Sequence, residues 1–197
     1  ITDVDAIHPG YGFLSENADF VRAVVAAGLT WIGPPADAIE LMGNKVRAKE
    51  IAAEAGVPVL SVTGEPTAAD LPLLVKASAG GGGRGMRIVD DLTRLPGEIE
   101  AAKAEALSAF GDGAVFVEPY VEAGRHVELQ ILSHAGGTDV LGSRDCSVQR
   151  RHQKVIEEAP APDLPAASYG AMADAAAALA DGIGYLGAGT VEYLFDP

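Results

Sequence analysis

The feature that most constrains this chain is a run of glycines between two short apolar segments. Residues 73–75 and 86–89 have the composition of β-strands. Between them lie five glycines, at positions 80–83 and 85. A backbone without Cβ atoms can approach a phosphate closely and direct its N–H groups toward it. The pattern predicts a flap between two strands, with Lys76 and Arg84 as cations for the same anion.

Other interpretations of the glycine run fit less well. Gly80, Gly82 and Gly85 match the spacing of a dinucleotide fingerprint, but that fingerprint opens a helix, whereas β-type residues follow here. A Walker A loop needs Gly-Lys-Ser/Thr after its glycines, which this chain lacks. A flexible linker is the remaining alternative. The flanking strands and the two cations favour a flap that covers phosphates.

Composition narrows the function classes. The chain has 14 Lys and Arg against 28 Asp and Glu, a net charge of -14, which argues against a nucleic-acid partner. No apolar run approaches the ~20 residues of a membrane span. The single cysteine, Cys146, excludes an intrachain disulfide and fits a reducing compartment. We therefore expect a cytoplasmic protein with no membrane partner.

The N-terminal third has the pattern of a parallel α/β unit. A short strand precedes His8, a helix follows that Ser15 could cap, and residues 30–32 form the next strand. Two helices are predicted after it, at residues 36–42 and 46–55. The apolar face expected for the first helix consists of Phe20, Val21, Val24 and Val25, with Gly28 as its stop.

The remainder is predicted to alternate strands with two long helices. The strands around the flap, a helix at 95–110 and a strand at 114–121 make an α+β unit, in which Pro119 excludes a central position. In the strand at 126–132, His126, Glu128 and Gln130 share one face. Further elements are expected as a hairpin turn at Gly136-Gly137, a helix at 166–181 and a strand at 190–195.

A cluster of cations stands out in this acidic chain. Four of the 14 basic residues and one of the four histidines fall within residues 144–155. In strand geometry Arg150, His152 and Lys154 project on one face, where an anion between them would relieve their repulsion. A solvated charge cluster is the alternative. Glu192 becomes a candidate metal ligand if its face of the last strand carries phosphates.

Four separated motifs, in the same order, resemble biotin carboxylase, the ATP-grasp component of biotin-dependent carboxylases. They occupy residues 8–17 (HPGYGFLSEN), 76–86 (KASAGGGGRGM), 149–154 (QRRHQK) followed by 157–160 (EEAP), and 187–192 (GAGTVE). The resemblance covers the whole chain. It implies an α/β fold with α+β ATP-grasp subdomains. The expected domains are the tail of a Rossmann-like N-terminal domain (1–33), a helical linker (34–58), the flap subdomain (59–121) and the first part of the C-terminal ATP-grasp subdomain (122–197).

The resemblance implies that ATP and bicarbonate give carboxyphosphate, whose CO2 is transferred to N1 of biotin on a carrier protein. This is the first half-reaction of an acyl-CoA or pyruvate-type carboxylase. The implied cofactors are ATP, Mg2+ (or Mn2+) and carrier-bound biotin. The implied partners are a biotin carboxyl carrier domain, a carboxyltransferase, bicarbonate and a second copy of the chain.

The resemblance also assigns site residues by position. Lys154 matches the bicarbonate-binding lysine, with His152 and Arg151 beside it as catalytic residues, and Glu192 matches the first carboxylate that chelates Mg2+. Glu118 would meet the exocyclic amine of adenine. The implied nucleotide-binding residues are Lys45 and Lys76 on the phosphates, Gly82 and Gly83 in the flap, Glu118, Pro119, Tyr120 and Val121 in the adenine hinge, and His126, Gln149 and His152 around ribose and phosphates.

The chain departs from the family pattern in three ways. Three parts of the family's site are expected beyond Pro197: the remaining metal ligands, the arginine that stabilises the biotin enolate and the glutamate base. The 197 residues alone should therefore not catalyse the reaction. The segment 59–75 is shorter than usual. Pro119 replaces a common lysine, and its carbonyl can still accept a hydrogen bond from adenine.

Two alternatives remain open at this point. Another ATP-grasp ligase, such as a carbamoyl-phosphate or purine-pathway enzyme, would also form an acyl phosphate. A non-catalytic nucleotide-binding or assembly module is the second. The sequence leaves the final acyl acceptor open.

Overall fold

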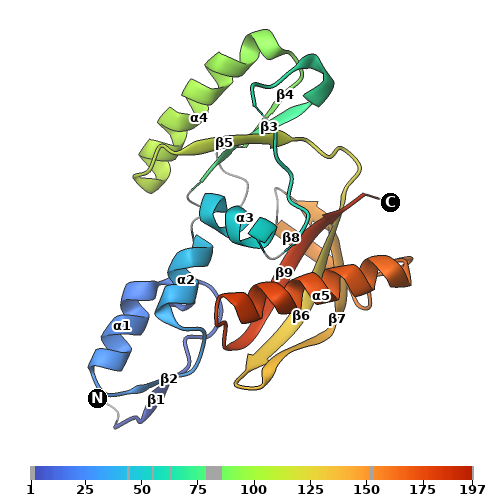
Figure 1. Ribbon diagram of the computed structural model, residues 1–197. Coiled ribbons are helices and arrows are strands. Elements are labelled where there is room, and N and C mark those ends of the chain that lie inside the picture. Colours follow the sequence, from blue (N-terminus) through green and yellow to red (C-terminus); the bar gives the residue numbers. More distant parts are fainter. Residues whose placement is uncertain are drawn as a thin grey trace.

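The computed structural model describes residues 3–43, 45–54, 56–62, 64–78, 86–150 and 153–196, except for the side chain of Lys45. The described residues form three separate sheets, of two, three and four strands. Figure 1 shows the smallest sheet near the N-terminus, the three-stranded sheet at the opposite end, and the four-stranded sheet with its helix beside them. The glycines of the predicted flap, with Arg84, lie outside the described residues.

The N-terminal elements confirm the parallel α/β pattern. Strands β1 (Ala6–Ile7) and β2 (Thr30–Trp31) pair in parallel, joined through η1 (Phe13–Glu16) and α1 (Ala18–Ala26). Helices α2 (Ala36–Gly43) and α3 (Lys45–Glu54) follow, as predicted. They lead from this unit toward the three-stranded sheet (Figure 1).

Two details predicted for α1 were wrong. Asn17, rather than Ser15, caps the helix: its Oδ1 accepts a hydrogen bond from the Phe20 N–H at 2.8 Å. The Ser15 hydroxyl instead donates to the carbonyl of Gly12, because residues 13–16 form a separate 3-10 turn before the helix. Val21 and Val24 are buried as expected, whereas Val25 is exposed.

The Asn17 cap provides a stability test. Asn17→Ala should lower the free energy of unfolding by about 1 kcal/mol, because an N–H of the first turn of α1 loses its acceptor. Chemical denaturation measures the change. Asn17→Asp keeps an oxygen acceptor and should leave the stability within a few tenths of a kcal/mol. An equal loss in both variants would contradict the capping role.

The three-stranded sheet carries one helix, as predicted. Its strands are β3 (Leu73–Ala77), β4 (Arg87–Val89) and β5 (Val115–Pro119), in the antiparallel order β4-β3-β5, with β5 at an edge as Pro119 requires. Helix α4 (Leu95–Phe110) covers one face. Short helices η2 (Ala68–Asp70) and η3 (Leu92–Arg94) flank the strands. The core under α4 consists of Leu73, Val75, Val89, Leu95 and Ala102.

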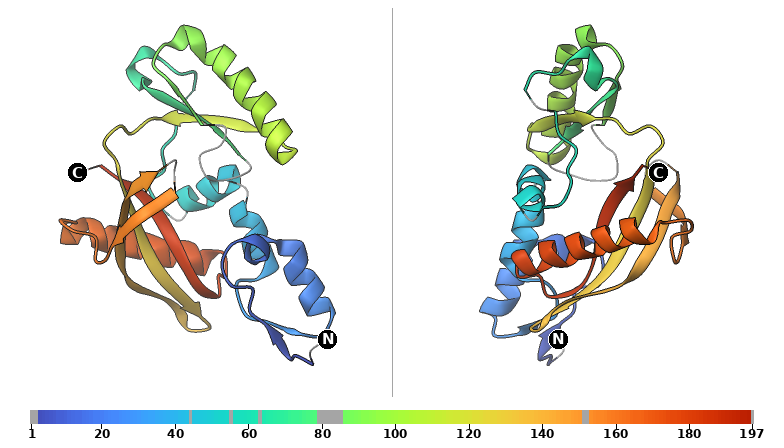
Figure 2. Two further views of the ribbon diagram at one scale, coloured as in Figure 1. Left: turned by 180° about the vertical axis from the view of Figure 1, so that it is seen from behind. Right: turned by 45° about the vertical axis from the view of Figure 1, so that its right-hand side comes forward.

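The four-stranded sheet is antiparallel, in the order β8-β7-β6-β9. Its strands are β6 (Arg125–His134), β7 (Gly137–Arg150), β8 (Gln153–Glu158) and β9 (Gly187–Phe195). Helix α5 (Ala166–Gly182) packs on one face, as both views in Figure 2 show, over a core of Leu129, Ile131, Ala176 and Ala180. The opposite face carries the polar residues of β6. The two-residue alternation predicted for this strand is confirmed.

The predicted cationic face on a single strand was wrong. Strands β7 and β8 form a hairpin, in which Gln149 pairs with Lys154 and Arg150 pairs with Gln153. Neighbouring residues of a strand point to opposite faces, so Arg150 and Lys154 do not share one. His152 and Arg151 lie outside the described residues.

Among the described residues, no helix is both long and apolar enough to cross a lipid bilayer.

Candidate functional site

A pocket of about 570 Å³ lies between the three-stranded sheet and the polar face of the four-stranded sheet. Residues from β3, β5, β6, β7 and β9, with the β5–β6 connection, line it. These elements come from distant parts of the chain. The lining includes most of the residues assigned by resemblance: Lys76, Glu118, Pro119, Tyr120, Val121, His126, Gln149 and Glu192.

One wall of the pocket centres on the buried carboxylate of Glu118. Lys76 Nζ lies 2.5 Å from its Oε1, and Lys49 Nζ lies 2.7 Å from its Oε2. The Glu118 side chain is only 6% exposed. A carboxylate removed from water needs charged partners, and the two lysines supply them from β3 and α3.

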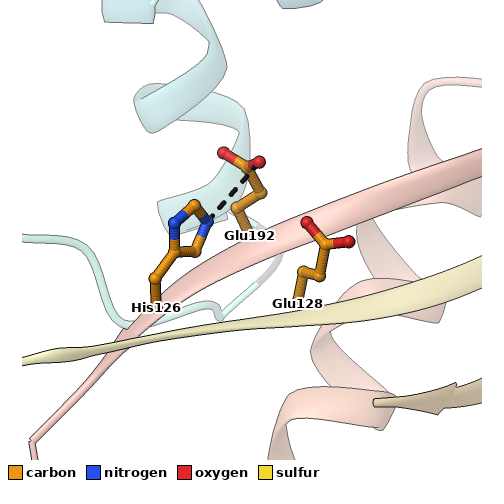
Figure 3. Close-up of side chains that lie close together, drawn as sticks. All are labelled: His126, Glu128 and Glu192. Carbon is orange, nitrogen blue, oxygen red and sulfur yellow. Dashed lines mark ion pairs between the residues drawn. The ribbon is translucent and has the colours of Figure 1, made fainter. Parts of the chain in front are cut away.

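The opposite wall brings His126, Gln149 and Glu192 together. Gln149 Nε2 lies 2.6 Å from His126 Nδ1, and the same amide donates to the Cys146 carbonyl at 2.8 Å. His126 Nε2 lies 3.5 Å from Glu192 Oε1. Figure 3 shows the imidazole and the Glu192 carboxylate facing each other, with Glu128 beside them. These contacts hold the imidazole ring between an amide and a carboxylate.

Next to this wall, Glu128 joins two cations. Its carboxylate accepts a hydrogen bond from Arg144 Nε at 2.7 Å and a second from the Lys154 ammonium, while Lys154 Nζ also lies 3.0 Å from Glu192 Oε1. Burial opposes ionisation of Glu128, but the hydrogen bonds and charges of Lys154 and Arg144 hold its pKa below the ordinary value. Burial also opposes the charge on Lys154, yet the two carboxylates raise its pKa above the ordinary value. Both groups are ionised at neutral pH.

Three of these side chains form a candidate cation site. Ligand atoms of His126, Glu128 and Glu192 all lie within 4.8 Å of one another. Mg2+ prefers oxygen ligands and is commonly held by one or two carboxylates together with substrate phosphates. Glu128 is already paired with Arg144 and Lys154, whereas the Glu192 side chain is 54% exposed. Glu192 is therefore the better placed carboxylate, and this donor set fits Mg2+ bound mainly through phosphates.

Part of the predicted site falls outside the described residues. Gly82, Gly83, Arg151 and His152 lie outside the described residues, as does the side chain of Lys45. Lys154 contacts Glu192 at the edge of the pocket without lining it.

The structure adds three residues that the sequence interpretation missed as site residues: Lys49, Glu128 and Arg144. Lys49 lies four residues after Lys45, on the same helix face, and this spacing was an available signal. Glu128 shared the predicted polar face with His126, but nothing local distinguished it from a surface residue.

Comparisons with known proteins identify the family of this chain. Residues 44–197 match the family model described as carbamoyl-phosphate synthase L chain, ATP binding domain, and residues 1–39 match that of the biotin carboxylase N-terminal domain. Biotin carboxylase from Haemophilus influenzae is 47% identical over 209 residues, an alignment that covers 100% of this chain and 47% of the relative. The chain belongs to the biotin carboxylase family.

Other relatives are larger carboxylases, and this chain matches a smaller part of each. Pyruvate carboxylase 1 from Caenorhabditis elegans is 49% identical, with 98% of this chain and 18% of the relative covered. The chain thus spans about half the length of the curated biotin carboxylases it matches, and less of the larger relatives.

Solved structures confirm the fold class. A biotin carboxylase from Campylobacter jejuni, solved as a β-γ-ATP complex, superposes with a TM-score of 0.90 at 43% identity, over 98% of this chain and 46% of that one. The biotin carboxylase domain of Hydrogenobacter thermophilus 2-oxoglutarate carboxylase was solved with MgADP, ADP and bicarbonate. It superposes with a TM-score of 0.88 at 43% identity, over 98% of this chain and 45% of that one. The predicted α/β ATP-grasp fold is confirmed.

Proposed function

We propose that the protein carrying this chain carboxylates biotin on a carrier protein, using ATP and bicarbonate by way of carboxyphosphate. One observation carries the proposal: a single pocket gathers Lys76, Glu118, His126, Gln149 and Glu192, with Lys154 at its edge. Its family relatives include biotin carboxylases and whole biotin-dependent carboxylases. The chain would supply the nucleotide and bicarbonate ends of the site, as the first half-reaction of an acyl-CoA or related carboxylase.

We assign the nucleotide to the space between the two sheets. Residues 118–121 form the hinge beside adenine, and Lys45, Lys76, Gly82 and Gly83 hold the phosphates. His126, Gln149 and His152 lie around the ribose and phosphates. The three-stranded sheet contributes the hinge and Lys76, and the four-stranded sheet contributes His126 and Gln149, which supports binding between them.

Lys154, with Arg151 and His152, is assigned to bicarbonate and carboxyphosphate. A fixed ammonium near the developing negative charge stabilises the transition state more than the ground state. The contacts of Lys154 with Glu128 and Glu192 support this role, because they hold the ammonium charged and restrict its position.

Glu192 is the proposed ligand for Mg2+ or Mn2+, with the nucleotide phosphates as further ligands. When bound, the metal neutralises phosphate charge during phosphoryl transfer. His126 and Lys154, both in contact with Glu192, would orient its carboxylate.

The proposed partners are a biotin carboxyl carrier domain, a carboxyltransferase domain or subunit, and a second copy of the protein. The proposed domains are those predicted from the sequence, at 1–33, 34–58, 59–121 and 122–197. The acidic composition and single cysteine support a cytoplasmic location without nucleic-acid partners.

Removing Lys76 tests the nucleotide site. In the full-length protein, Lys76→Ala should weaken ATP binding about tenfold, since one charge-assisted phosphate contact is lost. Isothermal titration calorimetry measures the affinity. Lys103→Ala, on the exposed face of α4, is the matched control and should bind as the wild type does. Wild-type affinity in Lys76→Ala would contradict the assignment.

A second candidate is an ATP-grasp ligase that carboxylates or phosphorylates a different acceptor. The match of residues 44–197 to the carbamoyl-phosphate synthase domain favours it. Bicarbonate-dependent ATP hydrolysis stimulated by biotin, and unaffected by amine acceptors, would favour biotin carboxylation instead.

A further inference from the structure

We infer that Lys49 is a positioning residue for the nucleotide: it neutralises Glu118 so that Lys76 can bind phosphate. The inference rests on the proposed nucleotide site and concerns a residue that the sequence motifs do not mark. Lys49 does not line the pocket, so it would act through Glu118.

The three charged groups gather on one face of the three-stranded sheet. Lys76 of β3 lies beside β5, where it pairs with Phe116, and Glu118 is two residues further along β5. This face lies opposite the core beneath α4 and toward α3, which carries Lys49 (Figures 1 and 2). Lys49 thus approaches the sheet from a separate helix, and its partner Glu118 lies 69 residues later in the chain.

Two contacts fix the Lys49 ammonium. Its Nζ lies 2.7 Å from Glu118 Oε2 and 5.0 Å from the centre of the Phe116 ring, a distance suited to a cation–π interaction. Phe116 and Glu118 are alternate residues of β5 and so share a face. The ammonium therefore has a defined position against this strand, which a mobile surface lysine would lack.

The charge of the group depends on Lys49. Two ammonium groups and one carboxylate leave a net positive charge, whereas Glu118 and Lys76 alone would be neutral. A triphosphate approaching Lys76 would then meet a cation already paired with an adjacent carboxylate. Lys49 keeps this wall of the pocket attractive to an anion.

Burial makes the second lysine necessary. The Glu118 side chain is 6% exposed, and it contacts Lys76 and Lys49 through different oxygens. If Lys76 moved to a phosphate without Lys49 present, the buried carboxylate of Glu118 would lose the last counter-ion that the described residues supply, which is strongly unfavourable. With Lys49 present, Glu118 stays paired while Lys76 changes partner.

The test compares ATP with adenosine in the full-length protein. Lys49→Met keeps the apolar stem and removes the charge. It should weaken ATP binding about tenfold, measured by calorimetry, and raise the KM for ATP with little change in kcat. Adenosine has no phosphates, so its affinity, measured by competition, should be unchanged. Lys49→Arg should restore ATP affinity to within about threefold, and Lys103→Met should match the wild type.

A double-variant cycle tests the route through Glu118. In a Glu118→Gln background, Lys49→Met should alter ATP affinity less than twofold, because no carboxylate remains to compete for Lys76. Unchanged ATP affinity in Lys49→Met alone would overturn the inference while leaving the nucleotide site intact. If Lys49→Met weakened the binding of ATP and adenosine equally, or abolished adenosine binding, the inference would also be overturned. Lys49 would then support the adenine hinge and not the phosphate contact of Lys76. A wild-type protein that binds ATP no more tightly than adenosine would instead refute the proposed site.

Discussion

Replacing Lys154 by alanine in the full-length protein should lower bicarbonate-dependent ATP hydrolysis about 100-fold, the usual cost of removing a single fixed electrostatic group from an active site. The ammonium lies between Glu128 and Glu192, and both carboxylates raise its pKa above the ordinary value despite burial. Its loss would remove the proposed bicarbonate cation and leave two neighbouring carboxylates without the charge between them. Steady-state phosphate release measures the effect.

The control for this variant is Lys103→Ala on α4, an exposed lysine paired only with Glu100 among the ion pairs of the described residues. It should retain full activity. If Lys154→Ala also kept wild-type hydrolysis, the bicarbonate assignment would fail, although the nucleotide site could still stand. The ATP affinity of Lys154→Ala, measured separately, distinguishes these outcomes.

Glu128→Gln should lower the free energy of unfolding by about 3 kcal/mol at pH 7, since it leaves Arg144 and Lys154 without their shared buried carboxylate. The Glu128 side chain is 3% exposed, so the variant replaces a buried charged partner of both cations with a neutral amide. Denaturant unfolding of the wild type and the variant measures the difference. Glu100→Gln, whose carboxylate is 72% exposed, should change stability by less than about 0.5 kcal/mol.

The effect of Glu128→Gln should depend on pH in a defined direction. Burial raises the pKa of Glu128, but Lys154 and Arg144 outweigh it, so the folded pKa lies below the ordinary value of 4.5. A carboxylate with a depressed folded pKa contributes stability above its unfolded pKa and loses it as the pH falls through the folded value. The difference in the free energy of unfolding between wild type and variant should therefore be constant near neutral pH and shrink below pH 4.5. A difference that grows on acidification would contradict this account.

Local patterns were sufficient for most secondary structure. The Ala-rich composition with Glu and Lys, followed by Gly111, placed α4 at its observed bounds, and alternation identified β6 and β9. The family followed from four motifs, each of which combines several residue types in order. The hairpin between β7 and β8 was missed because residues 149–154 contain no Gly, Pro or Asn to mark a turn, and alternating polar residues fit one strand as well as two.

The candidate site was harder to predict because its contacts join distant positions. Lys49 and Glu118 are 69 residues apart, and Lys154 and Glu128 are 26 apart. The local composition around these residues does not indicate either contact. The cap of α1 was assigned wrongly to Ser15 for a related reason: Ser15 and Asn17 are both good cap residues, and only the 3-10 turn before the helix decides between them.

Neighbouring residues of strand β6 serve two different purposes, the core and the candidate site. Val127, Leu129 and Ile131 are buried in the core, while His126, Glu128 and Gln130 lie on the opposite face of the strand, where His126 lines the candidate site. Substitutions at alternate positions can therefore tune the chemistry of the site with limited disturbance to the core. A shift of one residue in register would exchange the two sets and lose both. We therefore expect the insertion or deletion of a single residue in β6 to be far more disruptive than a single substitution on its polar face.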